Sequence, residues 1–279
     1  MRMLAGLALV FLALSTVACK GSAPLPAKAV DLNAQGVEAL ERGDLETADA
    51  RFELALEYNP RFTEALTNQG LVELQRGNMK RARKLLSRAR SINPDVAQPH
   101  HALGVLEEKL GRPDRASKHY QEALRIDPGF AAARANLARL AYEAGMYEHA
   151  REQFKRLVEV APEEPSGYVG LGASLVKLGR WDEADAIVSE GRGRFPENAE
   201  LAIAEGRSLI RRGQLSEAVQ LLRPMAQGRD DIAVAALGWL ATAELAQGAA
   251  RSAASHARRA LALSPDDAVA TFVLAQLEK

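Results

Sequence analysis

The 279-residue sequence contains a single cysteine, Cys19, so no disulfide can form within the chain. Aromatic residues make up only 5% of it, and 36 Lys and Arg balance 36 Asp and Glu, which gives a formal net charge of zero. A neutral chain has no general electrostatic attraction to nucleic acid or to an anionic membrane. Abundant alanine with few aromatic residues instead favours a core of closely packed helices.

Motifs that commonly carry catalysis are also missing. The sequence has no GxSxG elbow, no phosphate-binding glycine loop and no Cys/His pair. Its histidines show no metal-ligand spacing on one helix face with a supporting carboxylate: they are His100, His101, His119, His149 and His256. We therefore expect no enzymatic activity, no catalytic residues, no cofactor and no metal ion.

The beginning of the chain has the pattern of an export signal. Arg2 is followed by about 16 uncharged, mostly apolar residues, fewer than the roughly 20 that span a bilayer. Thr16, Val17, Ala18 and Cys19 resemble the bacterial lipobox, although Thr16 stands where that motif has Leu. A lone cysteine in an exported chain also fits lipid attachment better than redox chemistry.

This resemblance implies a signal peptide over 1–18, lipid attachment at Cys19 and a lipidated, flexible N-terminal tether over 19–28. Lys20 stands where inner-membrane retention requires Asp, so we expect an outer-membrane lipoprotein that faces the periplasm. Two alternatives stay open. The segment could be an ordinary cleaved signal that leaves a soluble periplasmic protein, or a retained membrane anchor.

Beyond the tether, three residue types recur with a period of 34 residues. Proline falls at positions 60, 94, 128, 162 and 196. Glycine keeps the same period, and an alanine follows each glycine after five residues, giving Gly43, Gly77, Gly111, Gly145, Gly179 and Gly213 with Ala48, Ala82, Ala116, Ala150, Ala184 and Ala218.

Each marker has a steric role in a pair of helices. Glycine ends the first helix, because a left-handed backbone is low in energy without a β-carbon. Alanine fits the closest approach of the two helices, where a larger side chain would push them apart. Proline ends the second helix and restricts the residue before it. The spacing therefore predicts consecutive helix–turn–helix units, of which residues 97–128 are representative.

The pattern resembles the tetratricopeptide repeat (TPR) family from Ala29 to the C-terminus. The family's small residue in the first helix corresponds to Gly36, Gly70, Gly104, Ala138, Gly172 and Gly206. Its large residue in the second helix corresponds to Phe52, Leu86, Tyr120, Phe154, Val188 and Leu222. The resemblance implies an all-α fold, a right-handed α-solenoid of about seven TPR helix pairs over 29–267 with a C-terminal capping helix over 268–279.

The sixth repeat is irregular. Pro224 predicts that its second helix ends or kinks near Arg223, and one additional residue moves the next markers to Gly248 and Ala253. After Pro265 we expect a last helix with an apolar stripe formed by Val269, Phe272, Val273 and Leu277.

The resemblance also implies a binding groove, because the first helices of TPR arrays line a concave surface. Positions two, five, nine and twelve of the repeats are then open to a partner: Asn33, Val37, Thr67, Leu71, Gln98, His101, Val105, Glu108, Ala132, Ala135, Arg139, Tyr142, Val169, Ala173, Ile203 and Arg207. This mixture suits an extended peptide or a helix of a protein partner.

Other polar residues have simpler interpretations. His100 falls where the family buries tryptophan, so we expect it in the core. A carboxylate clamp of the chaperone type needs an ordered set of Lys, Asn and Arg across three consecutive repeats. We do not expect one, because only Asn68 or Asn136 could belong to such a set. One predicted helix is basic throughout and carries Lys80, Arg81, Arg83, Lys84, Arg88 and Arg90. This pattern indicates either a patch that binds an anionic ligand or a solvated face whose charge is balanced by acids on neighbouring helices.

The sequence thus predicts a non-enzymatic, lipid-anchored TPR scaffold for protein–protein interactions in the bacterial envelope. It is similar to the outer-membrane TPR lipoproteins that assist assembly of type IV pilus secretins or polysaccharide export. The alternative is a carbohydrate- or cell-wall-binding periplasmic module in which the array is a spacer, although few aromatic residues are available for sugar stacking.

Overall fold

The computed structural model describes residues 25–278, which form fifteen α-helices and one short 3₁₀ helix and contain no strand. The predicted signal peptide and Cys19 lie outside the described residues. Within residues 25–278, no helix combines the length and the apolar character that crossing a bilayer requires.

Fourteen of these helices form seven consecutive pairs, each with a short turn between its members. The pairs are α1 (Ala27–Glu41) with α2 (Leu45–Tyr58), α3 (Thr63–Gln75) with α4 (Met79–Ile92), α5 (Ala97–Lys109) with α6 (Pro113–Ile126), α7 (Ala131–Glu143) with α8 (Tyr147–Val160), α9 (Pro165–Lys177) with α10 (Trp181–Arg194), α11 (Ala199–Arg211) with α12 (Leu215–Leu222), and α13 (Asp231–Ala246) with α14 (Ala250–Leu263). The short helix η1 (Met225–Gln227) follows α12, and α15 (Ala268–Leu277) is the last helix.

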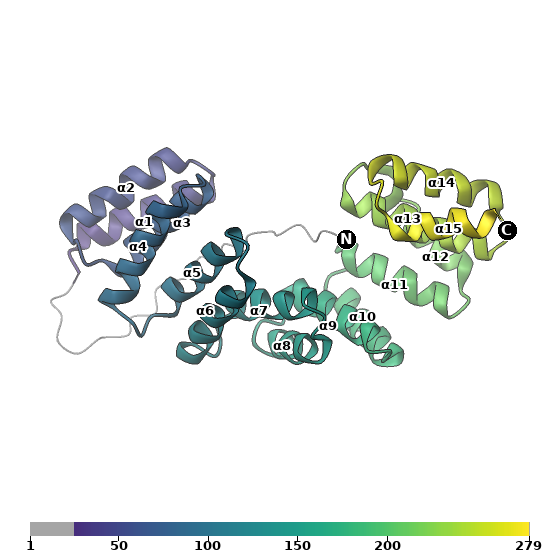
Figure 1. Cartoon of the computed structure of the whole chain (residues 1–279), viewed down its shortest axis with the longest axis horizontal. Coiled ribbons are helices and arrows are strands. Elements are labelled where there is room, and N and C mark those ends of the chain that lie inside the picture. Colours follow the sequence, from purple (N-terminus) through teal and green to yellow (C-terminus); the bar gives the residue numbers. More distant parts are fainter. Residues whose placement is uncertain (1–24, 279) are drawn as a thin grey trace. The chain divides into compact units, whose positions relative to one another are not determined.

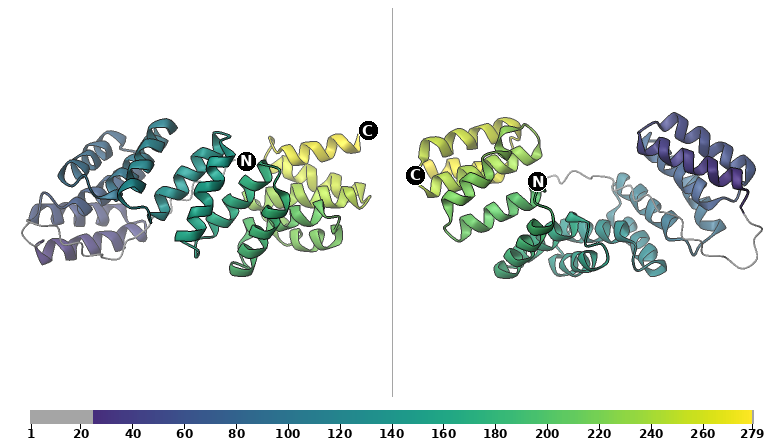
Figure 2. Two further views of the ribbon diagram at one scale, coloured as in Figure 1. Left: turned by 90° about the horizontal axis from the view of Figure 1, so that it is seen from below. Right: turned by 180° about the vertical axis from the view of Figure 1, so that it is seen from behind.

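The described residues divide into two compact units, 25–140 and 141–278, and the division falls inside α7. Within each unit, helices that follow one another pack side by side (Figures 1 and 2). First helices also contact the next first helix, so that α1, α3 and α5 form one row and α9, α11 and α13 another. We call each of these a first-helix row. Side-chain contacts between α5 and α7 extend the first row into residues 131–140. The all-α solenoid of helix pairs that the repeat predicted is confirmed.

A glycine with a left-handed backbone closes the turn of every pair. The φ angles of these seven glycines lie between 69° and 81°, and the seventh is Gly248, as the shifted register predicts. At the first turn, the Gly43 N–H donates to the Leu40 carbonyl (3.0 Å) and the Asp44 N–H to the Ala39 carbonyl (2.9 Å). These bonds satisfy carbonyl groups that the end of a helix would leave unpaired.

Small residues hold the two helices of a pair close together. The marker alanines from Ala48 to Ala253 are at most 2% exposed. The glycine of the first helix accommodates the large side chain of the second: a β-carbon added to Gly104 would lie 2.4 Å from Cε1 of Tyr120. Tyr120 is itself fully buried. The spacing of helices within a pair therefore depends on the absence of a side chain at this position.

Buried glutamates near the ends of first helices pair with arginines, a feature that the sequence analysis did not identify. Glu73, Glu107 and Glu244 are 0%, 2% and 3% exposed and occupy the same place near the end of a first helix. Arg83 on α4 lies 2.7 Å from Glu107 on α5, and Arg223, directly after α12, lies 3.7 Å from Glu244 on α13. These two ion pairs connect one helix pair to the first helix of the next.

The irregular sixth pair also follows the sequence. The helix α12 ends at Leu222, directly before Arg223 and Pro224, and η1 replaces its final turn. The side chain of Asp230 then caps α13 by accepting a hydrogen bond from the Ala233 N–H at 2.9 Å. The missing N–H of proline explains the early end of α12.

The last helix, α15, packs against α13 and α14 (Figure 2), and Asp267 caps it by accepting from the Ala270 N–H at 2.7 Å. Val273 is fully buried, whereas Phe272 is 56% exposed. The predicted place of Phe272 in the buried stripe is therefore wrong. The face that packs inward contains Ala270, Val273, Leu274 and Leu277, and Phe272 lies beside it on the helix surface.

Candidate functional site

The first-helix row of residues 25–140 carries most of the predicted groove residues. Thr67 and Ala132 are only 4% exposed, so the expectation that they are open to a partner is wrong. The Thr67 hydroxyl instead donates to the Thr63 carbonyl at 2.7 Å, one turn earlier in its own helix. The other groove residues of this unit are partly buried: Asn33, Val37, Leu71, Gln98, His101, Val105, Glu108, Ala135 and Arg139.

Side chains from successive first helices are bonded to each other along this row. The Asn68 amide on α3 donates to Asn33 Oδ1 on α1 at 3.1 Å. The Asn136 amide on α7 lies 3.0 Å from His101 Nε2 on α5. We call these two contacts, together with the ion pair of Glu108 on α5 and Arg139 on α7, the polar pairs. They fix side chains that would otherwise move freely on a helix surface.

A buried tyrosine, Tyr120, holds the Glu108 carboxylate of the ion pair in position. Glu108 accepts a hydrogen bond from the Tyr120 hydroxyl on α6 as well as contacting Arg139. Burial, together with the negative charge of Glu108, raises the pKa of Tyr120 well above its usual range. Tyr120 therefore remains a protonated donor, and the Glu108 carboxylate is held in one place.

His101 is neutral in the folded protein. Its ring lies between two aromatic rings, with centroid distances of 5.6 Å to Tyr120 and 5.1 Å to Phe130. Burial lowers the pKa of His101 to about 4. Because an amide N–H donates, Nε2 accepts from Asn136 and the imidazole proton lies on Nδ1. The side chain therefore contributes a neutral, positioned ring to the row and no positive charge.

An apolar strip runs beside the polar pairs. Val37, Leu71 and Val105 occupy position nine of the first three repeats and are partly buried. Each packs against buried residues of its own pair or the next one. We define these three residues as the apolar strip. The row thus offers fixed hydrogen-bonding groups alongside a narrow apolar surface.

Residues 141–278 present a different surface. Of the groove residues predicted there, Ile203 is 8% exposed and belongs to the core, so its predicted exposure is wrong. The remaining members are partly buried: Tyr142, Val169, Ala173 and Arg207. Position five of a first helix is therefore partly exposed in some repeats and buried in others.

The main feature of this surface is a group of cations and aromatic rings. Arg207 Cζ on α11 lies 4.7 Å from the ring centroid of Trp239 on α13. Tyr142 and Tyr147 form an edge-on pair with centroids 5.4 Å apart, and Lys177 Nζ lies 5.9 Å from the Tyr147 centroid. We call this group the arginine–aromatic cluster. Such contacts between a cation and a ring face are attractive.

Sequence reasoning missed part of both surfaces. Trp239 occupies position six of its repeat, as Asn68 and Asn136 do, and this position was not among those predicted to face the groove. Position six could have been identified from the repeat alignment, because three repeats carry a polar or aromatic residue at this position. The wrong assumption was that only positions two, five, nine and twelve reach the row.

Two further sequence predictions concern histidine and the basic helix. His100 is 7% exposed, and burial lowers its pKa, as expected for a residue in the core. On the basic helix, Arg83 is paired with Glu107 at 2.7 Å and Arg81 with Glu73 at 3.6 Å. The interpretation that neighbouring helices supply the balancing acids is confirmed for these two arginines.

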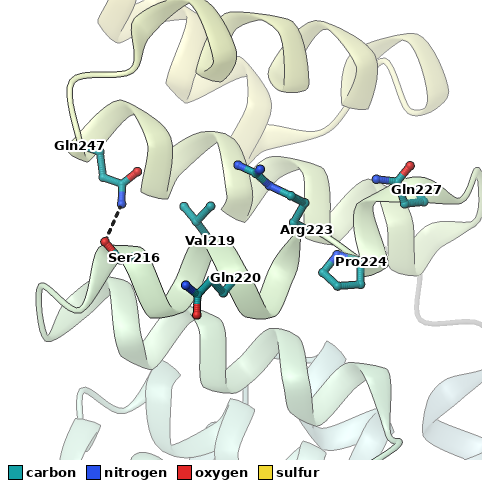
Figure 3. Close-up of a pocket in the computed structure, with 7 residues that line it drawn as sticks. All are labelled: Ser216, Val219, Gln220, Arg223, Pro224, Gln227 and Gln247. Atoms are coloured by element: carbon teal, nitrogen blue, oxygen red, sulfur yellow. Dashed lines mark hydrogen bonds between the residues drawn. The ribbon is translucent and has the colours of Figure 1, made fainter.

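An open depression of about 570 Å³ lies beside the break in the sixth pair (Figure 3). Its lining is Ser216, Val219, Gln220, Arg223, Pro224, Gln227 and Gln247. The one charged member, Arg223, contacts Glu244, and the Gln247 amide donates to the Ser216 hydroxyl at 3.4 Å. This lining offers no nucleophile with an adjacent base. Residues 25–278 also contain no group of three or more His, Cys, Asp or Glu placed to hold a metal ion.

Comparison with known families agrees with this geometry. Models described as tetratricopeptide repeat match residues 62–129, 109–175, and 169–232 together with 203–268. The chain belongs to the TPR family. The matched residues run from 62 to 268 and contain the glycine and alanine markers from Gly77 and Ala82 onward, but not Gly43 and Ala48 of the first repeat. No curated protein matches the sequence.

Solved TPR structures resemble the chain in fold. A TPR protein from Parabacteroides merdae is 18% identical, covers 91% of this chain with 100% of its own and has a TM-score of 0.60. Pseudomonas aeruginosa pilF is 23% identical over 77% of this chain and 97% of its own, with a TM-score of 0.65. YrrB, a TPR protein with an unusual peptide-binding site, is 21% identical over 67% and 96%, with a TM-score of 0.53.

Proposed function

We propose that the protein is a non-enzymatic scaffold that binds a segment of a protein partner along the first-helix row of residues 25–140. The observation that carries this proposal is the position of the polar pairs beside the apolar strip. An extended peptide presents backbone amides and carbonyls as well as apolar side chains, and the row offers a counterpart to both. Because the polar pairs already hold their side chains, binding costs little ordering of the scaffold.

We further propose that a lipid on Cys19 holds this scaffold at the outer membrane, where it serves assembly of an envelope complex of the pilus-secretin or polysaccharide-export type. The lipobox-like sequence before Cys19 supports the anchor. The similarity in fold to Pseudomonas aeruginosa pilF is compatible with this proposal.

The peptide-binding part is tested by crosslinking in cells that produce the full chain. A photo-activatable residue replaces Val105, which lies on the row and takes part in none of the polar pairs. The matched control places the same residue at Gln121, an exposed position on the second helix α6. We expect a discrete crosslinked protein from position 105 and none from position 121. Equal capture at both positions, or none at either, would contradict the proposal.

The anchor is tested by Cys19→Ser. We expect this variant to move from the membrane fraction to the soluble periplasmic fraction with the same helical content by circular dichroism. If the variant stays with the membranes, a lipid on Cys19 is not what holds the protein there.

A further inference from the structure

Arg207 differs from Arg192, another partly buried arginine of residues 141–278. Arg192, on α10 of the same unit, is paired with Glu205 at 2.9 Å. Arg207 on α11 is also partly buried, but among residues 25–278 no carboxylate pairs with it. A guanidinium that has lost part of its water without gaining a counter-ion is an unfavourable arrangement unless a ligand completes it.

The contacts of Arg207 compensate for this only in part. Its guanidinium lies over the Trp239 ring at 4.7 Å, which provides an attractive but weak interaction. Burial lowers the pKa of Arg207, and the Tyr142 hydroxyl is the one group that opposes this shift. The guanidinium still carries five N–H donors in one plane, and this fork matches the two oxygens of a carboxylate.

The surroundings favour a peptide over a saccharide. A sugar would need an open aromatic face, but Arg207 covers the Trp239 ring, and Trp239 also packs against the core of α11–α15. Tyr142, Tyr147 and Lys177 extend the cluster with two more rings and a second cation. Arginine, tyrosine and tryptophan are the residue types that dominate the energetics of protein–protein interfaces.

We propose that Arg207, stacked on Trp239, binds a carboxylate of an acidic peptide segment in a protein partner, with Lys177, over the Tyr147 ring, as a second cation of the cluster. This inference rests on the proposed protein-binding function and adds the chemistry of one bound segment. It concerns residues 141–278, whereas the crosslinking test at Val105 concerns residues 25–140. Failure of one test therefore leaves the other unaffected.

The experiment is calorimetric titration of the full chain with a short, capped oligoglutamate peptide and with oligoglutamine of the same length. We expect oligoglutamate to bind at least about tenfold more tightly than oligoglutamine. Arg207→Lys keeps the charge but removes the fork, and should weaken oligoglutamate binding by about tenfold or more. Circular dichroism checks that the Arg207→Lys variant is folded. Lys177→Gln is a second variant, at an exposed position outside the core, and we expect it to weaken oligoglutamate binding by about twofold to fivefold.

The matched control is Arg211→Lys. Arg211 also lies near a tryptophan, with Cζ 6.0 Å from the Trp181 centroid, but it is paired with Asp185 and is therefore not available to a ligand. We expect less than about a twofold change in binding for this variant. In a Trp181→Phe background, Trp239 is the remaining tryptophan, and its fluorescence should change in parallel with the calorimetric titration.

Four outcomes would overturn the proposal. These are no binding of oligoglutamate, equal binding of oligoglutamate and oligoglutamine, an equal loss in the Arg207 and Arg211 variants, and tighter binding of an oligogalacturonate than of oligoglutamate. The last of these would assign the site to an acidic saccharide instead of a peptide.

Discussion

Substituting Gly104 with alanine tests whether the absence of a side chain sets the spacing of a helix pair. An added β-carbon would lie 2.4 Å from Cε1 and 2.7 Å from Cδ1 of Tyr120, distances that real β-carbons do not adopt. The ring cannot easily move away, because Tyr120 is fully buried and its hydroxyl donates to Glu108. The helices α5 and α6 must therefore separate, or the hydrogen bond must break.

The expected magnitude follows from two opposing effects. Overpacking a core by one methyl group costs about 1–3 kcal/mol. Replacing glycine by alanine inside a helix regains about 1 kcal/mol of helix propensity. Since the Tyr120 ring is held at both ends, the cost falls toward the upper part of its range. We expect Gly104→Ala to lower the free energy of unfolding by about 1–2 kcal/mol.

Gly193→Ala is the matched control, because a β-carbon at Gly193 in α10 would meet no atom within 4 Å. Here only the propensity gain remains, and we expect stabilisation by about 0.5–1 kcal/mol. Urea denaturation followed by circular dichroism measures both variants against the unchanged chain. The reasoning is refuted if the two substitutions shift the midpoint in the same direction.

Three further substitutions address packing, protonation and charge. Ala116→Glu places a carboxylate at a fully buried position and should cost about 2–4 kcal/mol, so an unchanged melting temperature would show that the helix register is wrong. His101 has a folded pKa of about 4, below its unfolded value, so the unfolded chain takes up the proton first and stability falls as the pH drops from about 6.5 to about 4. His101→Gln should remove about 2–3 kcal/mol of that loss, measured as a flatter pH dependence of the denaturation midpoint; an unchanged pH dependence would contradict this. Glu107→Gln leaves Arg83 without its buried partner and should cost about 1–2 kcal/mol, measured by denaturation at low salt; an unchanged midpoint would contradict this expectation.

The helix pairs could be predicted from sequence because each marker answers a local steric requirement. A φ of +75° at Gly43 is strained for any residue with a β-carbon, and the requirement is the same at every turn. The early end of α12 is equally local, since Pro224 removes a backbone donor. Requirements of this kind depend on a few neighbouring residues, so they are visible in a single sequence.

The candidate sites were less accessible to sequence reasoning, because they depend on contacts between repeats. Whether position five faces a partner depends on the side chain: His101 is partly buried in the row, whereas Thr67 bonds back to its own helix and Ile203 enters the core. The contact between Arg207 and Trp239 joins helices α11 and α13, and its two residues stand at different repeat positions. A periodic pattern identifies equivalent positions, but it does not identify pairs of this kind.

The positions that specify helix packing overlap in part with those that form the two candidate binding surfaces. Gly104 sets the distance between paired helices, whereas Val105, next to it on the same helix, belongs to the apolar strip. Tyr120 has both roles, because its ring fills the space at Gly104 and its hydroxyl donates to Glu108. Residues 25–140 combine polar pairs, in which the one charged pair is internally balanced, with an apolar strip, and residues 141–278 combine an uncompensated arginine with aromatic rings. Two surfaces with such different chemistry favour two different segments of a partner over one repeated motif.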